Sequence, residues 1–252
     1  MEKIQILRGN TMARTNYSTY LAIKRKILDI FRSEKFENNK LPPESQLSKR
    51  LGISLVTLRE ALLMLALEGY ITKRHGSGNY IHPSALGFEN RSYYFMECLK
   101  RDGFEPSMEV LEQTYIPADE HLAGLLKLSP GDRLLRNRLL YKADGKPAIL
   151  TVGHIPAAYL IRTDIENMDF LQLHVMLEEF CGKDLAHSLC EILPLGLPDG
   201  MESLFELPAG SPITYMEQVF YSIQDDPILC NLHYIYPNRY KIRTLQNWAL
   251  GN

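Results

Sequence analysis

Basic side chains gather between residues 49 and 75, where they could bind a polyanion. Arg59 lies in the first turns of a segment with helical spacing, and an arginine there can pair with a guanine through two hydrogen bonds. Such a pair discriminates against the wrong base by about 1–3 kcal/mol; the alternative is an ordinary surface ion pair. Thr57 suits a phosphate or a thymine methyl group. Four further cations suit phosphates, which hold a duplex without reading it: Lys49, Arg50, Lys73 and Arg74.

The charge of the chain is divided unevenly. Its net charge is −2, but residues 1–82 carry 14 lysines and arginines against 7 acidic residues, and the remainder carries 14 against 23. A basic first third joined to an acidic remainder favours a nucleic-acid-binding module that carries a second module of another kind.

The elements that would position the basic side chains form a winged helix-turn-helix in residues 41–81, a shape that places one helix in the major groove. Gly52 allows a sharp turn, Ser54 suits the N-cap of the second helix, and Gly69 suits its end. Two short β-prone runs follow around a turn at 75–78. The apolar stripe predicted for the second helix is Val56, Leu58, Leu62, Leu63, Leu65 and Leu67.

These residues resemble the GntR family of bacterial transcription regulators. The motifs that carry the resemblance are Leu41-Pro42, Leu51-Gly52-Ile53-Ser54, Arg59-Glu60-Ala61-Leu62, Glu68-Gly69 and Gly76-Ser77-Gly78. The resemblance implies a wing tip that enters the minor groove, formed here by His75 with Gly76 and Gly78.

Two positions depart from the family pattern. The family usually has an arginine after the glutamate of the first helix and another after the serine that begins the second helix, but this chain has Ser45 and Leu55. We therefore expect an operator unlike the usual family sequence, or weaker binding. The complete set of predicted DNA contacts is Ser45, Lys49, Arg50, Ser54, Thr57, Arg59, Lys73, Arg74, His75, Gly76 and Ser77.

From about Ser92 the sequence predicts an α+β domain. Helices are expected at 93–100, 119–126, 171–180 and 200–205, and strands at 107–116, 134–141, 148–155, 186–195, 213–221 and 227–236. The order of helix, turn, strand, turn and strand occurs twice in this part of the chain. This internal repeat, together with four short motifs, resembles the UTRA effector-binding domain of the HutC branch of the GntR family. That domain has a chorismate-lyase-like fold with an antiparallel sheet. The four motifs are Ile116-Pro117-Ala118-Asp119, Asp144-Gly145-Lys146-Pro147, Ile155-Pro156 and Arg239-Tyr240.

The resemblance implies a small effector, often an anion. It places Arg136 where the family carries a strand arginine, and Arg138 lies on the same strand face two residues later. Two arginines together favour a carboxylate or phosphate, although a solvated strand face paired with acidic residues is the alternative. Arg91 and Ser92 could offer backbone and hydroxyl groups to a phosphate.

The predicted pocket is less polar than the family pattern. The family often has a glutamate and a serine on the strand where this chain has Thr151-Val152-Gly153-His154, and charged residues where it has Leu229 and Leu232. A sugar needs many polar partners, so a sugar phosphate is disfavoured. The predicted effector contacts are Arg91, Ser92, Arg136, Arg138, Thr151, His154, Asn231, His233 and Tyr234.

The sequence thus predicts an effector-controlled DNA-binding regulator, expected to be a repressor. The predicted organisation is a DNA-binding domain at 1–82 with a mobile arm at 1–15, a linker at 83–91, and a UTRA-like effector and dimerisation domain at 92–252. The expected partners are double-stranded DNA with a pseudo-palindromic operator, a small anionic metabolite and a second copy of the chain.

Other classes of protein are less well supported. We find no motif of nucleophilic, metal-dependent or phosphate-loop catalysis, so an enzyme is not expected, and neither a cofactor nor a metal site is predicted. Two alternatives stay open: an architectural DNA-binding protein without an effector, and a small-molecule enzyme on the lyase-like domain. No apolar run long enough for a membrane helix occurs, the first residues, MEKIQILRGN, lack the apolar core expected of a secretion signal, and the four cysteines form no Cys-x-x-Cys pair. A cytoplasmic protein is therefore expected.

Overall fold

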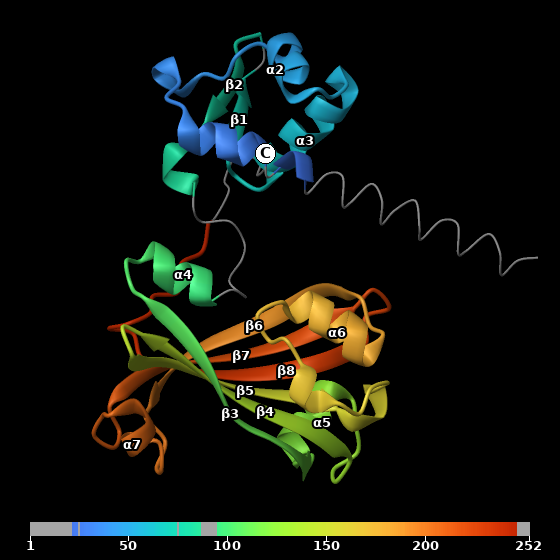
Figure 1. Ribbon diagram of the computed structural model, residues 1–252, viewed down its shortest axis with the longest axis vertical. Helices are drawn as coiled ribbons and strands as arrows, with labels where there is room; N and C mark the ends of the chain where they lie inside the picture. Colours follow the sequence, from blue (N-terminus) through green and yellow to red (C-terminus); the bar gives the residue numbers. More distant parts are fainter. Residues whose placement is uncertain (1–21, 25, 75, 87–94, 246–252) are drawn as a thin grey trace, which may run out of the picture. The chain divides into compact units, whose positions relative to one another are not determined.

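The computed structural model describes residues 22–24, 26–74, 76–86 and 95–245 (Figure 1). The chain divides into two compact units, Met1–Arg91 with Arg243–Asn252, and Ser92–Ile242. The arm predicted at 1–15 and most of the predicted linker lie outside the described residues. No helix within the described ranges is long and apolar enough to cross a membrane.

The first unit is a small helical domain with a two-stranded wing. Residues 22–24 and 26–33 are helical. There follow the 3₁₀ turn η1 (Glu37–Asn39), α2 (Glu44–Leu51), α3 (Leu55–Leu67), β1 (Ile71–Arg74), β2 (Gly78–Ile81) and η2 (Pro83–Ala85). β1 and β2 are antiparallel, with Ile71 opposite Ile81 and Arg74 opposite Gly78.

Local sequence explains the turn between α2 and α3. Gly52 adopts a left-handed conformation (φ 67°), which costs a glycine little. Ser54 caps α3 by accepting a hydrogen bond from the backbone of Thr57. The predicted turn and cap are therefore both present.

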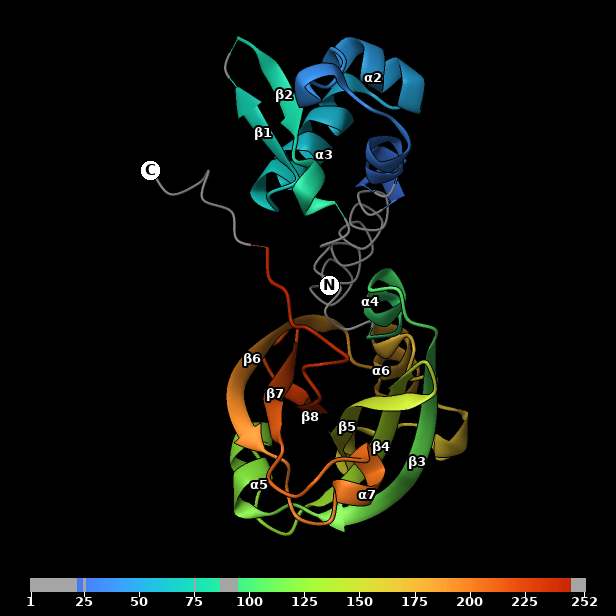
Figure 2. The ribbon, with the colours of Figure 1, turned by 90° about the vertical axis from the view of Figure 1, so that its left-hand side faces the viewer.

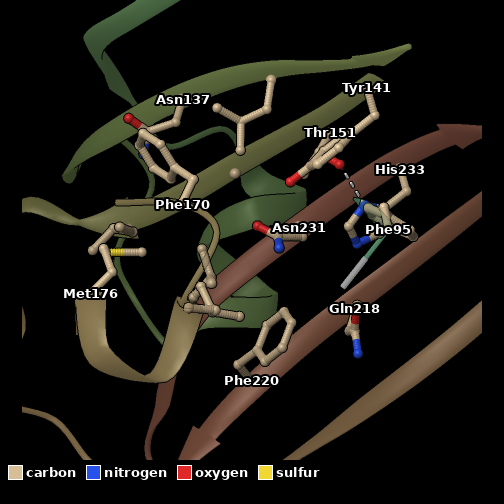
Figure 3. Close-up of a pocket in the computed structure, with 15 residues that line it drawn as sticks. Phe95, Asn137, Tyr141, Thr151, Phe170, Met176, Gln218, Phe220, Asn231 and His233 are labelled. Carbon is tan, nitrogen blue, oxygen red and sulfur yellow. Dashed lines mark hydrogen bonds between the residues drawn. The ribbon is translucent and has the colours of Figure 1, made fainter. Parts of the chain in front are cut away.

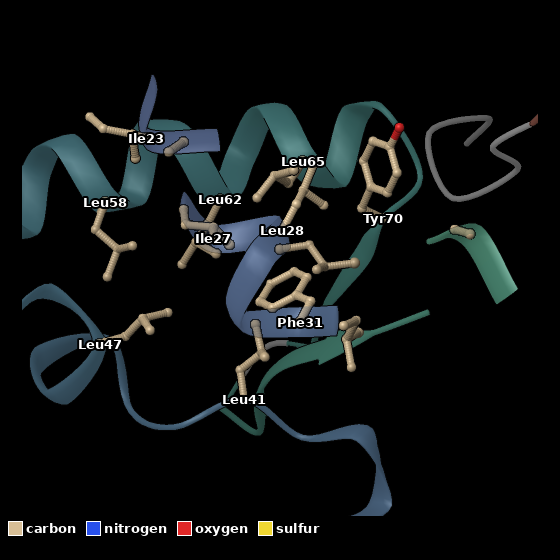
Figure 4. Packing of buried hydrophobic residues seen from close by; sticks show 14 residues of the cluster. Ile23, Ile27, Leu28, Phe31, Leu41, Leu47, Leu58, Leu62, Leu65 and Tyr70 are labelled. Carbon is tan, nitrogen blue, oxygen red and sulfur yellow. The ribbon is translucent and has the colours of Figure 1, made fainter. Parts of the chain in front are cut away.

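A single apolar core holds the first unit together (Figure 4). From α3 it takes Leu58, Ala61, Leu62 and Leu65, which lie against Ile27, Leu28 and Phe31 of the first helix. The predicted stripe was partly wrong, because Val56, Leu63 and Leu67 are exposed. α3 is apolar nearly all round, so residue type did not show which side faces the core.

The second unit is an α+β domain built on one sheet. Its elements are α4 (Phe95–Arg101), β3 (Pro106–Pro117), α5 (Glu120–Leu126), β4 (Arg133–Ala143), β5 (Lys146–Pro156), η3 (Ala157–Tyr159), η4 (Ile165–Asn167), α6 (Leu173–Cys181), β6 (Leu185–Gly196), α7 (Glu202–Phe205), β7 (Pro212–Ser222) and β8 (Pro227–Ile235). All six strands pair antiparallel in the order β3-β4-β5-β8-β7-β6. Figure 2 shows this sheet as a curved layer.

Helices cover both faces of the sheet. α4 and α6 pack on one face, against alternate residues such as Tyr141 of β4 and Phe220 of β7. α5 and α7 pack on the other face, against the strand residues that alternate with these, such as Leu134 of β4 and Leu150 of β5. We call these the α4/α6 face and the α5/α7 face. Because side chains alternate along a strand, neighbouring residues of β4 face different sets of helices.

Candidate functional site

The N-terminal end of α3 presents both polar and apolar side chains to solvent. Ser54 Oγ accepts from the backbone nitrogen of Thr57 at 3.0 Å and lies 2.7 Å from Thr57 Oγ1. Val56 is 66% exposed and the Arg59 side chain is 59% exposed. The orphan backbone N–H groups of a helix start lie here too, and they attract phosphate.

The carboxylate of Glu44 connects α2 with α3 and with the two strands of the wing. On α2, it accepts from Arg59 Nε of α3 at 2.7 Å and from Asn79 Nδ2 of β2 at 3.3 Å, and it lies 4.0 Å from Lys73 Nζ of β1. The hydrogen bond from Arg59, followed by the other contacts, holds the pKa of Glu44 below its usual value. The ion pair that was the alternative reading of Arg59 is therefore present in the protein without DNA.

The other predicted contacts of the first unit lie around this centre. Ser45 and Lys49 are exposed on α2, whereas Arg50 is engaged by Glu34, with 2.8 Å between Arg50 Nη1 and Glu34 Oε2. In the wing, the guanidinium of Arg74 lies 4.5 Å from the ring centre of Tyr80. Ser77 Oγ is 2.6 Å from the Tyr80 hydroxyl, and Gly76 has a φ of 69°. His75 lies outside the described residues.

The second unit contains a cavity on the α4/α6 face of the sheet, between the strands and the helices that cover them (Figure 3). Its volume, counted together with the open space at its mouth, is about 520 Å³. Its lining consists of Phe95, Asn137, Leu139, Tyr141, Thr151, Gly153, Ile155, Phe170, Leu173, Met176, Gln218, Phe220, Leu229, Asn231 and His233. No lysine, arginine, aspartate or glutamate is among these described residues.

The titratable groups of the lining are held neutral. His233 is buried, its Nδ1 lies 2.8 Å from Thr151 Oγ1, and its Nε2 has no partner among the described atoms. Desolvation lowers the pKa of His233 to about 3, and burial raises the pKa of Tyr141. The cavity therefore carries no formal charge from these residues near neutral pH.

Carboxamides supply most of the remaining polarity. Asn137 Oδ1 accepts from Gln113 Nε2 at 3.2 Å, and Gln218 Nε2 donates to Ser188 Oγ at 3.0 Å. A Cβ on Gly153 would lie 2.8 Å from Asn231 Oδ1. The glycine therefore leaves room for the Asn231 amide to lie against β5.

The structure divides the predicted effector residues between the two faces. Thr151, Asn231 and His233 line the cavity together, whereas Arg136, Arg138, His154 and Tyr234 occupy the alternate positions and so lie on the α5/α7 face. The prediction that all of them surround one site is corrected by strand alternation. Arg91 and Ser92 lie outside the described residues.

Arg136 and Arg138 are engaged by an acidic residue. Arg136 Nη2 donates to Glu112 Oε1 at 2.8 Å, and Arg138 Nη1 lies 3.8 Å from Glu112 Oε2. This is the paired strand face considered as their alternative. Nearby on the same face His154 is buried, and its pKa falls to about 4, chiefly through desolvation. Across the described ranges, no three His, Cys, Asp or Glu side chains gather in a way that could hold a metal ion.

Sequence reasoning missed several lining residues. Asn137 and Gln218 are buried polar residues inside strands, and Gly153 is a glycine in a strand interior. Such residues often mark a close approach of a ligand or another chain segment, so that signal was present. Phe95, Phe170 and Met176 come from helices and a loop, and only the tertiary fold brings them to the sheet.

Comparisons with known proteins agree with this architecture. Residues 101–241 match the UTRA domain, and residues 19–81 match the bacterial regulatory proteins of the gntR family. The uncharacterized HTH-type transcriptional regulator YurK of Bacillus subtilis is 25% identical, over 87% of this chain and 92% of the relative. The mannosyl-D-glycerate transport/metabolism system repressor MngR of Escherichia coli is 29% identical, over 73% of this chain and 77% of the relative.

A solved structure shows the same fold. The possible transcriptional regulator YydK of Bacillus subtilis superposes with a TM-score of 0.68 over 90% of this chain and 99% of that chain, at 18% identity.

Proposed function

The chain belongs to the GntR family of transcription regulators, in the branch with a C-terminal UTRA domain, and from this premise we propose that it is a repressor whose operator affinity is set by a small molecule bound in the cavity of the α4/α6 face. The observation that carries the proposal is the pairing of two surfaces in one chain. One unit exposes the start of α3 beside a basic wing strand, and the other encloses a cavity lined by polar and apolar groups. As a regulator that acts on DNA, it would work in the cytoplasm.

In the DNA-bound state Arg59 would exchange Glu44 for a base edge. The Arg59 side of the pair with Glu44 is exposed, and a solvent-exposed ion pair contributes only about 0–1 kcal/mol. A bidentate contact to guanine is worth more than that. Lys49, Lys73 and Arg74 would contact phosphates and hold the helix in register.

Apolar side chains would read the positions that lack the family arginines. Leu55 and Val56 lie at the start of α3, and Val56 is exposed. An apolar side chain at a base edge favours the thymine methyl group. We propose an operator with thymines at the positions that these two residues reach.

The proposed assembly is a two-fold dimer on a pseudo-palindromic operator. β6 is an edge strand of the sheet, and it exposes four apolar side chains: Leu189, Ile192, Leu193 and Leu195. An exposed apolar edge strand readily pairs with another chain. A second copy of this strand would cover it and give two DNA-binding units, as a palindrome requires.

An anionic effector bound by Arg136 and Arg138 stays a prediction. An anion at these residues would have to displace the carboxylate of Glu112, which already contacts both. The cavity of the α4/α6 face needs no such exchange, and this is why we place the effector there.

The experiment that tests the function is selection of bound sequences from random DNA by the full-length chain, followed by binding titrations at two salt concentrations. We expect an enriched inverted repeat and an affinity that falls steeply with salt. Recovery of unenriched DNA would favour an architectural DNA-binding protein. Absence of any DNA binding would contradict a regulator and favour the alternative of an enzyme.

A further inference from the structure

The cavity of the α4/α6 face differs from an anion site in the charge of its lining. Fifteen residues line it and none of them is an arginine or lysine. Its histidine is held neutral by burial. An anion that entered would lose its hydration and gain no opposite charge, which is among the most costly changes in a protein interior. The lining therefore rejects anions.

The apolar part of the lining is rich in rings. Phe95, Tyr141, Phe170 and Phe220 surround the space, and Figure 3 shows their side chains, from β4, β7, α4 and a loop, converging on it. Phe95 and Tyr141 meet edge to face, with ring centroids 5.2 Å apart. Because these rings form much of the wall, a flat molecule that stacks on or against them gains more contact than a heavily hydrated one.

The polar part of the lining both donates and accepts hydrogen bonds. Asn137, Gln218 and Asn231 each carry a carbonyl oxygen beside an amino group. The side-chain amide of Asn231 has no hydrogen-bond partner among the described residues, and it lies at the cavity wall above Gly153. A carboxamide matches a second amide-like edge with two antiparallel hydrogen bonds, as asparagine does with adenine.

From these three observations we infer that the effector is an uncharged aromatic or heteroaromatic molecule with an amide-like edge, which inserts between the rings and pairs with Asn231. This inference rests on the proposed function for the location of the site, and it adds the chemical class of the ligand. A lactam, a carboxamide on a ring and a nucleobase all have this chemistry.

Benzamide and benzoate form a matched pair of probes. They share a ring and nearly the same shape, but benzamide is neutral with a donor and an acceptor, whereas benzoate is an anion without a donor. In calorimetric titrations of the full-length chain we expect benzamide to bind at millimolar or lower concentration and benzoate at least about 100-fold more weakly.

Two glycine substitutions locate the binding. In Gly153→Ala the new methyl group would lie 2.8 Å from Asn231 Oδ1, at the end of a flexible side chain, and at ordinary contact distance from Leu229 Cδ1 (3.7 Å) and the Asn137 carbonyl oxygen (3.9 Å). The fold should therefore tolerate the change while the amide is pushed into the cavity. We expect benzamide affinity to fall at least about tenfold. In the control Gly124→Ala, on α5, the methyl group meets nothing within 4 Å, and benzamide affinity should not change.

Several outcomes would overturn the inference. One is benzoate or inorganic phosphate binding better than benzamide, with a loss in Arg136→Gln and none in Gly153→Ala, which would assign the effector to the arginines of the α5/α7 face. Another is failure of the wild-type chain to bind benzamide at all. Binding of operator DNA without ligand is measured in parallel. A chain that binds DNA but prefers benzoate contradicts only the ligand class, whereas one that binds benzamide but no DNA contradicts the proposed function.

Discussion

At the scale of single residues, Glu44 would compete with DNA for Arg59 in the proposed complex. The carboxylate contacts Arg59, Asn79 and Lys73 at once, so it holds the recognition helix and the wing strands in fixed relation. In the proposed complex it would also place a negative charge near the phosphates. The same residue would therefore order the surface and weaken its attraction for DNA.

Arg59→Ala and Lys73→Ala should have different effects on DNA binding. Loss of Arg59 removes a base contact, so the preference for operator over scrambled DNA should fall by about 1–3 kcal/mol. Loss of Lys73 removes a phosphate contact, so both DNAs should weaken alike and the salt dependence should decrease by about one ion. Fluorescence anisotropy with both duplexes measures this. Unchanged discrimination in Arg59→Ala would contradict the assignment of α3 as the recognition helix.

The two buried histidines should make the protein sensitive to mild acid. Burial lowers the pKa of His233 to about 3 and that of His154 to about 4, below the unfolded value of about 6.5. Between these limits the unfolded chain binds more protons, so stability should fall as the pH decreases from about 6.5 towards 4. Each histidine contributes up to about 1.4 kcal/mol per pH unit.

Urea unfolding at pH 7.5 and pH 5 checks this dependence. His233→Gln should show a smaller loss of unfolding free energy between the two pH values than the wild type, whatever the substitution costs at pH 7.5. An equal loss in both proteins would mean that His233 is not the group that titrates.

At the scale of elements, sequence patterns predicted much of the fold. The helices and strands of the second unit lie within about two residues of their predicted ends, because turn residues such as Asp144-Gly145 and caps such as Asp119 act locally. The faces were harder to predict. Arg136 and Asn137 are neighbours of similar polarity, and alternation shows that they face apart without showing which one faces the cavity. That depends on where α4 and α6 pack, which is a property of the tertiary structure.

The N-cap of α5 should contribute measurably to the second unit. Asp119 Oδ1 accepts from the backbone nitrogen of Leu122 at 2.8 Å, and α5 covers part of the sheet through Leu122 and Leu126. Asp119→Ala should lower the free energy of unfolding by about 1 kcal/mol, and Asp119→Asn, which keeps an accepting oxygen, by less. Equal losses in urea titrations of the two variants would indicate that the hydrogen bond is not what stabilises the helix.

At the scale of the whole molecule, the β6 edge should determine assembly. Leu193 is 53% exposed on this strand, and a lysine at an edge strand opposes pairing with another chain. Leu193→Lys should therefore shift the chain from dimer to monomer in analytical ultracentrifugation and reduce affinity for a two-site operator far more than for a half-site. The exposed change Ile223→Lys, outside the strands, is the matched control. A wild-type chain that is monomeric with and without DNA would contradict the dimer.

Control of operator affinity by a ligand requires a coupling that is equal in both directions. If benzamide changes the dissociation constant of the operator by some factor, operator DNA must change the dissociation constant of benzamide by the same factor, because the two routes to the ternary complex have one total free energy. We expect about 1–3 kcal/mol of coupling, a factor of about 5–150. Titrating operator at saturating benzamide, and benzamide at saturating operator, measures both sides of this cycle. In Gly153→Ala the benzamide titration should shift to higher concentrations than those that saturate the wild type. A factor of one on both sides, with benzamide still bound, would mean that the second unit binds a ligand without controlling DNA, and the chain would then act as an architectural protein.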